Sequence, residues 1–153
     1  MSGTHEAGAG RSPAPAGTVL AFDFGTRKIG VALGNTITGT ARALDTLREE
    51  SNAARYAAIG VLVDAWQPIV LVAGRPLHAD GTAHATTALA DKFARELARR
   101  FRLPVEQVDE RYTTQVAEIE RSGPDKRGAD RDALAAQIIL QAWLDARSPS
   151  SSP

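Results

Sequence analysis

Two short hydrophobic runs separated by a glycine-containing turn open the patterned part of the chain. Residues 19–24 have the sequence VLAFDF and residues 29–34 the sequence IGVALG, with GTRK between them. Two such runs joined by a short turn predict a β-hairpin. The more polar segment TGTARAL, residues 38–44, predicts a third strand. We therefore expect the domain to begin with three antiparallel strands.

Helical and strand patterns alternate along the rest of the chain. From Ser51 or Asn52 to Trp66, apolar side chains recur at i, i+4 spacing, and Ser or Asn is a favoured N-cap. The helix is expected to end before Pro68, and the continuously apolar run at 69–73 predicts a strand buried on both faces. The predicted elements that follow are a helix at 82–102 with Leu89, Phe93, Leu97 and Phe101 on its core face, a strand at 104–108, a short helix at 114–121 and a final helix at 130–147.

This order of elements predicts an α/β domain. Three antiparallel strands followed by βαβ units are expected to form a mixed sheet with helices on its faces. A chain of 153 residues with 43% hydrophobic and 24% charged residues is typical of one globular domain. We expect this domain at residues 18–147. Residues 1–17 and 148–153 are rich in small residues and proline, so we expect disordered tails there.

The composition excludes several kinds of site. The chain has no cysteine, which excludes disulfides and thiolate metal sites. No apolar run has the length of a membrane span, and the N-terminal segment lacks the apolar stretch of a secretory signal. We therefore expect a cytoplasmic protein without a membrane partner. Lys plus Arg and Asp plus Glu both number 18, so any binding to nucleic-acid phosphates must depend on local clusters of cations.

A carboxylate interrupts the first hydrophobic run. In strand alternation Asp23 falls on the same face as Val19 and Ala21. A buried charge costs several kcal/mol unless it is paired or binds a metal. One interpretation is an acid at a strand end that caps the following turn; the other is a functional carboxylate.

Two further acids, Asp109 and Glu110, follow the predicted strand PVEQV directly. The ends of central strands are where α/β sheets collect functional groups. Two acids in this place are also typical of a solvated loop. Periodicity does not decide which of the two matters.

The position of Asp132 in the last predicted helix is more informative. Counting onward by 3, 4, 7 and 11 residues gives Ala135, Ala136, Ile139 and Trp143, which form the apolar stripe of the helix. The helix dipole favours an acid in the first turn by about 0.3–1 kcal/mol, which explains an acid here. It does not explain one in line with the apolar stripe. Asp132 is therefore expected to face the sheet.

Carboxylates that meet at the ends of neighbouring strands repel one another unless a cation lies among them. Hard divalent ions such as Mg²⁺ or Mn²⁺ prefer oxygen ligands. Two such ions about 3.5–4 Å apart can hold the attacking water and the leaving oxygen of a phosphodiester. The residues thus support the hypothesis of metal-assisted phosphoryl hydrolysis.

Four segments resemble successive motifs of the YqgF family, which comprises bacterial ribonuclease H-like proteins described as nucleases of precursor 16S ribosomal RNA and as Holliday-junction-resolvase-like proteins. The segments are DFGTRKIGVA, VAGRPLHADGT, VDERYTT and DALAAQIILQAWL. The resemblance covers about residues 19–144. It implies a ribonuclease H-like fold with a five-stranded mixed sheet, a divalent metal, and an acidic site of Asp23, Glu110 and Asp132 that both binds metal and catalyses.

The sequence departs from the family pattern in two places. The basic pair of the first motif is usually Lys-Arg, whereas here it is Arg27-Lys28. The loop that usually resembles LPLNMDG has the sequence RPLHADG at residues 75–81, without the asparagine. A substrate contact from this loop is therefore in question, while all three acids are present.

Several cations lie near the proposed acids in sequence and are candidates for holding substrate phosphates. Surface solvation is the alternative for each of them. The candidates are Arg27, Lys28, Arg111, Lys126 and Arg127. Another group, Arg95, Arg99, Arg100 and Arg102, lies at the end of a predicted helix, where the dipole favours cations, and we interpret it as mostly structural.

The leading functional hypothesis is a nuclease that processes the 5′ end of precursor 16S ribosomal RNA during ribosome biogenesis. An alternative substrate is a branched DNA junction, which a resolvase would cut as a symmetric dimer. A second class of function is a non-catalytic RNA-binding module for ribosome assembly. The expected partners are nucleic acid and, through it, ribosomal particles, with the protein acting as a monomer or a dimer.

Overall fold

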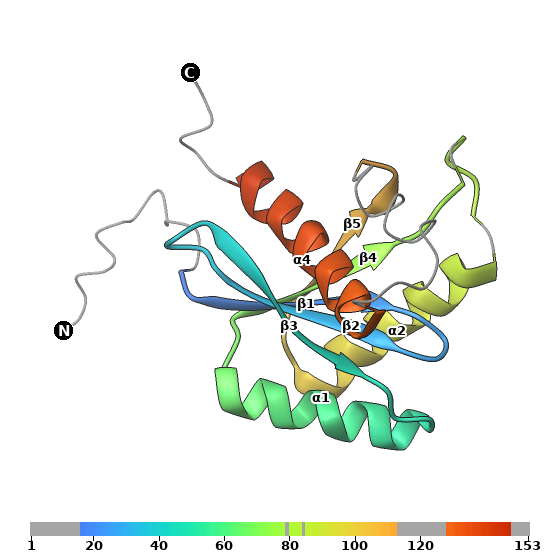
Figure 1. The fold of residues 1–153 in the computed structure, drawn as a ribbon, viewed down its shortest axis with the longest axis horizontal. Coiled ribbons are helices and arrows are strands. Elements are labelled where there is room, and N and C mark those ends of the chain that lie inside the picture. Colours follow the sequence, from blue (N-terminus) through green and yellow to red (C-terminus); the bar gives the residue numbers. More distant parts are fainter. Residues whose placement is uncertain (1–15, 79, 84, 113–127, 148–153) are drawn as a thin grey trace.

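Five strands and the helices around them make up the described part of the protein. The computed structural model describes residues 16–78, 80–83, 85–112 and 128–147. The strands are β1 (Thr18–Phe24), β2 (Ile29–Asn35), β3 (Thr40–Leu47), β4 (Val70–Arg75) and β5 (Val105–Asp109). The helices are α1 (Asn52–Trp66), α2 (Ala85–Phe101) and α4 (Gly128–Arg147), with a 3-10 turn at Glu110–Tyr112 (Figure 1).

The strands form one mixed sheet in the order β3-β2-β1-β4-β5. β1, β2 and β3 pair antiparallel, whereas β4 pairs parallel to both β1 and β5. This confirms the predicted α/β class and the predicted mixed sheet. The predicted bounds of the third strand, 38–44, are wrong by a few residues. Residues 36–39 form the turn, and β3 continues to Leu47.

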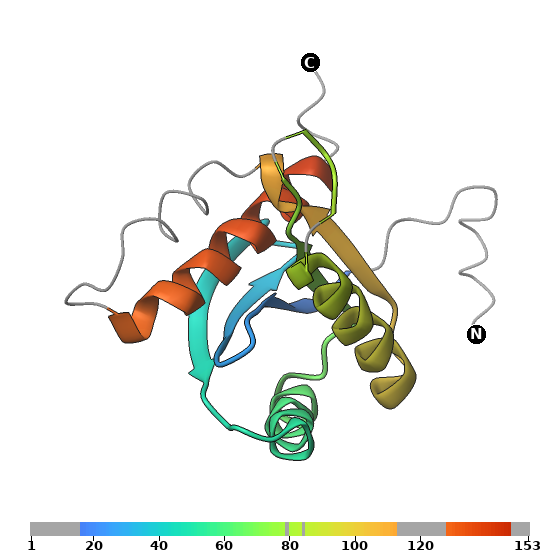
Figure 2. The ribbon, with the colours of Figure 1, turned by 90° about the vertical axis from the view of Figure 1, so that its right-hand side faces the viewer.

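Helices cover both faces of the sheet, so β1 is buried on both sides. Figure 2 shows α4 on one face and α1 with α2 on the other. On the α4 face, Val19 and Ala21 of β1 pack against Ala136 and Ile139 of α4. On the opposite face, Leu20 and Phe22 join Ile59, Phe93 and Leu97. The alternation expected for β1 therefore decides which layer each side chain enters.

The apolar stripe predicted for the last helix is buried. Ala135, Ala136, Ile139 and Trp143 are each at most 7% exposed. The same helix also covers the edge strand β3, because Gln137 and Gln141 accept hydrogen bonds from the backbone N–H groups of Ala43 and Ala41. At the opposite edge, β5 pairs with β4, and Nε1 of Trp143 in α4 donates a hydrogen bond to Glu106 of β5.

The close approach of α4 to the sheet depends on a glycine. The carbonyl oxygen of Asp132 occupies the place that a Cβ at position 30 would take, and the amide nitrogen of Ala133 lies 3.0 Å from that place. Gly30 is the cross-strand partner of Asp23. The first turns of α4 therefore lie directly on the hairpin beside Asp23.

Two predicted core positions are wrong. Leu89 begins the predicted stripe of α2 but is 45% exposed, because the helix turns Thr87 and Ala90, each 1% exposed, towards the core instead. Trp66 ends the predicted stripe of α1 but is 37% exposed, and the guanidinium of Arg42 lies 5.8 Å from its ring.

Part of the predicted organisation lies outside the described residues. This applies to most of the two predicted tails, to the predicted helix at 114–121 and to the turn before α4. The boundaries of the domain at residues 18–147 thus stay a prediction. No helix in the described ranges has the length and apolar character needed to cross a membrane.

Replacing Gly30 tests the packing of α4. Gly30→Ala places a methyl group where the Asp132 carbonyl lies, so we expect α4 to shift and the free energy of unfolding to fall by about 1–3 kcal/mol. Gly60→Ala is the control, because its Cβ would lie 3.5 Å from Phe101 in ordinary contact. Alanine is also favoured over glycine inside α1. Urea unfolding of both variants measures the difference, and equal stabilities would contradict the close contact.

Candidate active site

Asp23 lies near the end of β1, on the face of the sheet that α4 covers. Its side chain follows Val19 and Ala21 in the alternation, as expected, and the residue is 8% exposed. It is the cross-strand partner of Gly30, whose missing side chain leaves room for α4. Asp23 is therefore a buried acid at the contact between the hairpin and α4.

Asp132 comes to the same place from α4. Its backbone rests on Gly30, and its Oδ2 atom lies 3.3 Å from Nζ of Lys28 in the β1–β2 turn. Oδ2 is buried and receives no hydrogen bond, although the ion pair with Lys28 compensates part of its charge. A buried carboxylate oxygen without a hydrogen-bond donor is typical of a site for an additional ligand.

Glu110 comes to the same face from the end of β5. Its Oε2 atom occupies the place that a Cβ at Gly74 would take, and Cδ1 of Ile139 in α4 lies 2.8 Å from that place. β1 and β4 pair in parallel at Phe22 and Ala73. Asp23 and Gly74 are the next residues of these two strands, so they lie at the same end of the sheet. The Glu110 carboxylate therefore lies over β4 beside the end of β1.

The three acids thus lie on one face, at one end of the sheet, around the first half of α4. Their donors are all carboxylate oxygens, which suit a hard divalent cation. Within the described part of the chain, however, no three acidic or histidine side chains are gathered closely enough to hold a metal ion. The three acids offer the type of oxygen donor that a metal ion prefers and lie at the same end of the sheet. Their side chains are not already gathered around a metal position.

The neighbouring acid, Asp109, has a different role. Its carboxylate accepts hydrogen bonds from Nε and Nη2 of Arg111, the latter at 2.7 Å, and from the backbone N–H of Arg111 at 2.9 Å. These contacts hold the pKa of Asp109 below its ordinary value, chiefly through the hydrogen bond from the Arg111 side chain. Asp109 and Arg111 therefore pair at the sheet edge, while Glu110 between them turns towards α4.

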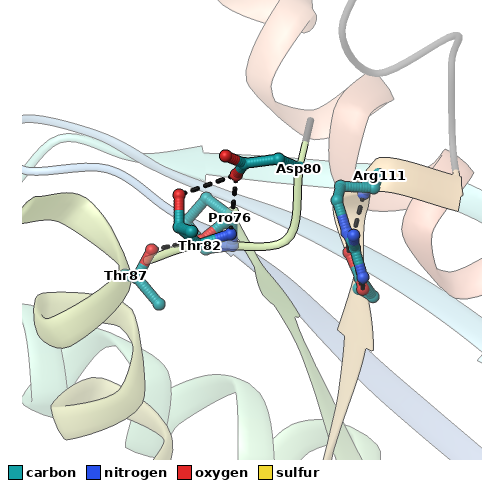
Figure 3. Close-up of polar contacts among 6 residues, drawn as sticks. Pro76, Asp80, Thr82, Thr87 and Arg111 are labelled. Carbon is teal, nitrogen blue, oxygen red and sulfur yellow. Dashed lines mark hydrogen bonds and ion pairs between the residues drawn. The ribbon is translucent and has the colours of Figure 1, made fainter. Parts of the chain in front are cut away.

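Arg111 also contacts the loop that follows β4. Its Nη1 atom lies 2.9 Å from the place of a Cβ at Gly81, whose φ of +93° is unfavourable for other residues. Within the loop, Oδ1 of Asp80 accepts hydrogen bonds from the backbone N–H and the hydroxyl of Thr82, and the Thr87 hydroxyl donates to the Pro76 carbonyl (Figure 3). The loop after β4, which lacks the asparagine usual in the family, is thus held by hydrogen bonds to Asp80.

A buried arginine supports the turn of the hairpin from the other face. Arg55 of α1 is 5% exposed and donates to the backbone carbonyls of Glu49, Gly25 and Thr26. Sequence reasoning missed this residue. The available signal is its spacing, because Arg55 is four residues before the buried Ile59 and so shares its helix face.

The predicted phosphate contacts have different surroundings. Arg27 is exposed in the β1–β2 turn, Lys28 pairs with Asp132, and Arg111 pairs with Asp109. Lys126 and Arg127 lie outside the described residues. The structure therefore places Asp23, Glu110 and Asp132 on one face at one end of the sheet, with Lys28 beside Asp132 and Arg27 in the adjoining turn.

Comparison with known proteins matches most of the chain. The model of a family described as "RuvX: Holliday junction resolvase" matches residues 17–146. A relative from Dechloromonas aromatica, named "Putative pre-16S rRNA nuclease", is 53% identical over 133 residues, which cover 84% of this chain and 91% of that protein. A relative of the same name from Nitrosomonas europaea is 47% identical over 137 residues, which cover 86% and 92%.

Two solved structures share the fold at low sequence identity. RuvC of T. thermophilus, in complex with a Holliday junction substrate, is 16% identical with a TM-score of 0.55 and matches 85% of this chain and 94% of that chain. The yeast mitochondrial Holliday junction resolvase Ydc2 is 12% identical with a TM-score of 0.52, and the match covers 87% and 80%. The fold predicted from the sequence is thereby confirmed as that of RuvC-like, ribonuclease H-like proteins.

The pair of Asp109 and Arg111 predicts a pH-dependent contribution to stability. Because the pKa of Asp109 is lowered in the folded state, its contribution is present above the unfolded pKa and is lost as the pH falls through the folded value. We expect Asp109→Asn to be less stable than wild type by about 1 kcal/mol at pH 7. The two proteins should converge as the pH falls through the lowered pKa of Asp109. Urea unfolding across this range measures the difference, with the exposed Asp64→Asn as control. A difference that stays constant with pH would contradict the assignment.

Proposed function

The chain belongs to the RuvX family, described as Holliday junction resolvase, and we propose that Asp23, Glu110 and Asp132 form the site with which it hydrolyses phosphodiester bonds. This match confirms the family membership that the four motifs predicted, since RuvX and YqgF denote the same family. The predicted enzyme class, a nuclease, is confirmed as well, because relatives about half identical to this chain carry the name of a nuclease. The identity of the site residues is our proposal.

The observation that carries this proposal is the convergence of three acids from three elements on one face of the sheet. Asp23 is buried at the end of β1, Glu110 lies over Gly74, and Asp132 lies over Gly30. Both glycines lack the side chain that would exclude these contacts. A divalent cation would allow these three carboxylates to come together at this end of the sheet, since without one they repel each other.

We assign all three acids to binding of a divalent cation, Mg²⁺ or Mn²⁺. The buried Oδ2 of Asp132, which lacks a hydrogen-bond donor, is the atom that fits such a ligand best. When bound, the ion supplies Lewis acidity towards the phosphate and activates a water for attack. The carboxylates would orient that water, while the closely packed α4 restricts solvent on one side of the site.

The neighbouring cations are proposed to hold the phosphates of the substrate. Arg27 is exposed in the turn next to Asp23, and Arg111 lies at the end of β5 between Glu110 and the β4–α2 loop. Lys28 is proposed to exchange its partner, from Asp132 to a phosphate. Lys126 and Arg127 directly precede α4 in the sequence and are assigned the same role. Cationic side chains position phosphates without reading the base sequence.

The substrate we propose is the 5′ region of precursor 16S ribosomal RNA, with the protein working in the cytoplasm on RNA or on ribosomal particles. The names of the relatives at 47–53% identity support this choice. A four-way DNA junction is the second candidate, supported by the family description. A non-catalytic RNA-binding role in ribosome assembly is the third.

Neutralising the acids tests the site. We expect Asp23→Asn, Glu110→Gln and Asp132→Asn each to lower the cleavage rate by about a hundredfold or more, equivalent to about 3 kcal/mol of transition-state stabilisation. Purified protein with Mg²⁺ or Mn²⁺ is given a 5′-extended precursor 16S RNA and, separately, a synthetic four-way DNA junction. Asp64→Asn is the matched control, since Asp64 is an exposed acid of α1 on the other face of the sheet.

Each outcome of this experiment has a definite meaning. Cleavage of the RNA alone supports the proposed substrate, and cleavage of the junction alone transfers the site to DNA. Full activity in the three acid variants would disprove the site. Absence of cleavage and of calorimetric metal binding in the wild type would favour the non-catalytic role.

The ion pair of Lys28 with Asp132 gives a separate test that requires no substrate. The ammonium group lies where a metal ion would compete for the same carboxylate oxygen. We therefore expect Lys28→Gln to bind Mn²⁺ about two- to fivefold more tightly, as expected for loss of a partly exposed ion pair. Titration calorimetry measures this affinity, and Arg27→Gln removes an equal charge from the same turn as a control. Equal affinities of the two variants would argue against a metal at Asp132.

A further inference from the structure

Positive charge is concentrated on one helix of an otherwise neutral chain. The chain has 18 cations and 18 acids, but residues 91–102 contain five cations and two acids. This segment comprises the second half of α2 and the residue after it. A protein with no net charge must attract nucleic acid through such local concentrations.

Four of these cations form one exposed row, which we call the α2 ridge: Lys92, Arg95, Arg99 and Arg102. The spacing of three and four residues keeps Lys92, Arg95 and Arg99 on one side of the helix over about 10 Å. Arg102 directly follows the end of the helix, with a φ of +55°. The side chain of Arg99 is 67% exposed even though it pairs with Glu96. Arg100 is not part of the ridge, because its guanidinium lies over the ring of Tyr56 at 4.2 Å.

The helix dipole does not account for the whole ridge. It favours cations in the last turn, which explains Arg99 and Arg102. Lys92 and Arg95 lie more than a turn before the end of α2 at Phe101, beyond the range of that effect.

A groove of about 430 Å³ runs beside the ridge, between α2 and the edge strand β5. Ala94, Ala98 and Val105 line its apolar part, and Arg75, Arg95 and Gln107 its polar part. Asp91 also lines the groove, but its charge is compensated by Arg75 at 2.9 Å and it accepts a hydrogen bond from Gln107. The groove therefore combines an apolar surface with cationic and amide groups.

The groove begins at the end of the sheet where the acids lie. Arg75 is the last residue of β4. On the opposite face of the sheet, the Glu110 carboxylate lies over the preceding residue, Gly74. A volume of this size is in the range of ordinary ligand pockets and can take a nucleotide or two of a single strand, not the width of a duplex. Phosphates of the same strand would then lie along the α2 ridge.

We propose that the α2 ridge and the α2–β5 groove bind a single-stranded part of the nucleic-acid substrate beyond the bond that is cut. This inference rests on the proposed function for the identity of the partner. It replaces the mostly structural interpretation of Arg95, Arg99 and Arg102 by a binding role. The ridge contacts backbone phosphates, so its contribution is independent of base sequence and weakens with salt.

The test measures the salt dependence of binding. A 20-nucleotide single-stranded RNA with a fluorescent label is titrated at several KCl concentrations with full-length protein carrying Asp132→Asn to prevent cleavage. Adding Lys92→Gln and Arg95→Gln together should reduce the slope of log K against log salt by about 1.4, since each phosphate contact to a single strand contributes about 0.7. The control adds Arg42→Gln and Arg48→Gln, which remove the same charge from two exposed residues, one in β3 and one directly after it, at the opposite edge of the sheet.

A slope equal to that of the control would overturn the proposal, as would binding of RNA without salt dependence. A cleavage assay separates this result from the proposed function. In a protein with intact acids, the ridge variant should raise KM several-fold and leave kcat unchanged, because the ridge is remote from the reacting bond. If the acid variants retain activity but the ridge alters the slope, the acid site fails and the ridge stands. If the acid variants lose activity but the ridge variant has the same slope as the control, only the proposal for the ridge fails.

Discussion

The candidate site depends on the contact of α4 with the hairpin at Gly30. The Asp132 carbonyl fills the place of a side chain there, so the helix lies closer to the sheet than any larger residue permits. This contact brings an acid from the end of the chain next to an acid on its first strand. Gly74 makes a similar space for Glu110 on β4. Two absent side chains thus allow acids from three distant segments to share one face of the sheet.

The order of elements and the faces of β1 and α4 could be predicted because hydrophobic periodicity reports burial directly. Asp23 and Asp132 stood out for the same reason, since each is a charged residue in an apolar pattern. The roles of Asp109 and Glu110 could not be separated by periodicity, because the choice depends on which carboxylate Arg111 binds. Leu89 was placed in the core in error, because the i, i+4 count of large apolar residues passed over Thr87 and Ala90, the small side chains that the helix buries there.

Several cations near the acids compensate carboxylates in the described structure. Lys28 lies beside Asp132, and Arg111 holds Asp109 at the sheet edge. Such pairs keep a dense group of acids compatible with a folded domain before substrate or metal arrives. A chain without net charge then needs a separate positive surface for nucleic acid, and α2 is the element on which the described cations gather. Under the two proposals made above, the acids and the phosphates of a bound strand would lie on different surfaces of one small protein.

The hydrogen bonds of Arg55 have a consequence for how the sequence can vary. All three acceptors are main-chain carbonyls, at Gly25, Thr26 and Glu49. Side chains at positions 26 and 49 can therefore be exchanged during evolution without loss of these acceptors. The order Arg27-Lys28 likewise leaves these three hydrogen bonds unchanged, because none of them depends on a side chain of the turn.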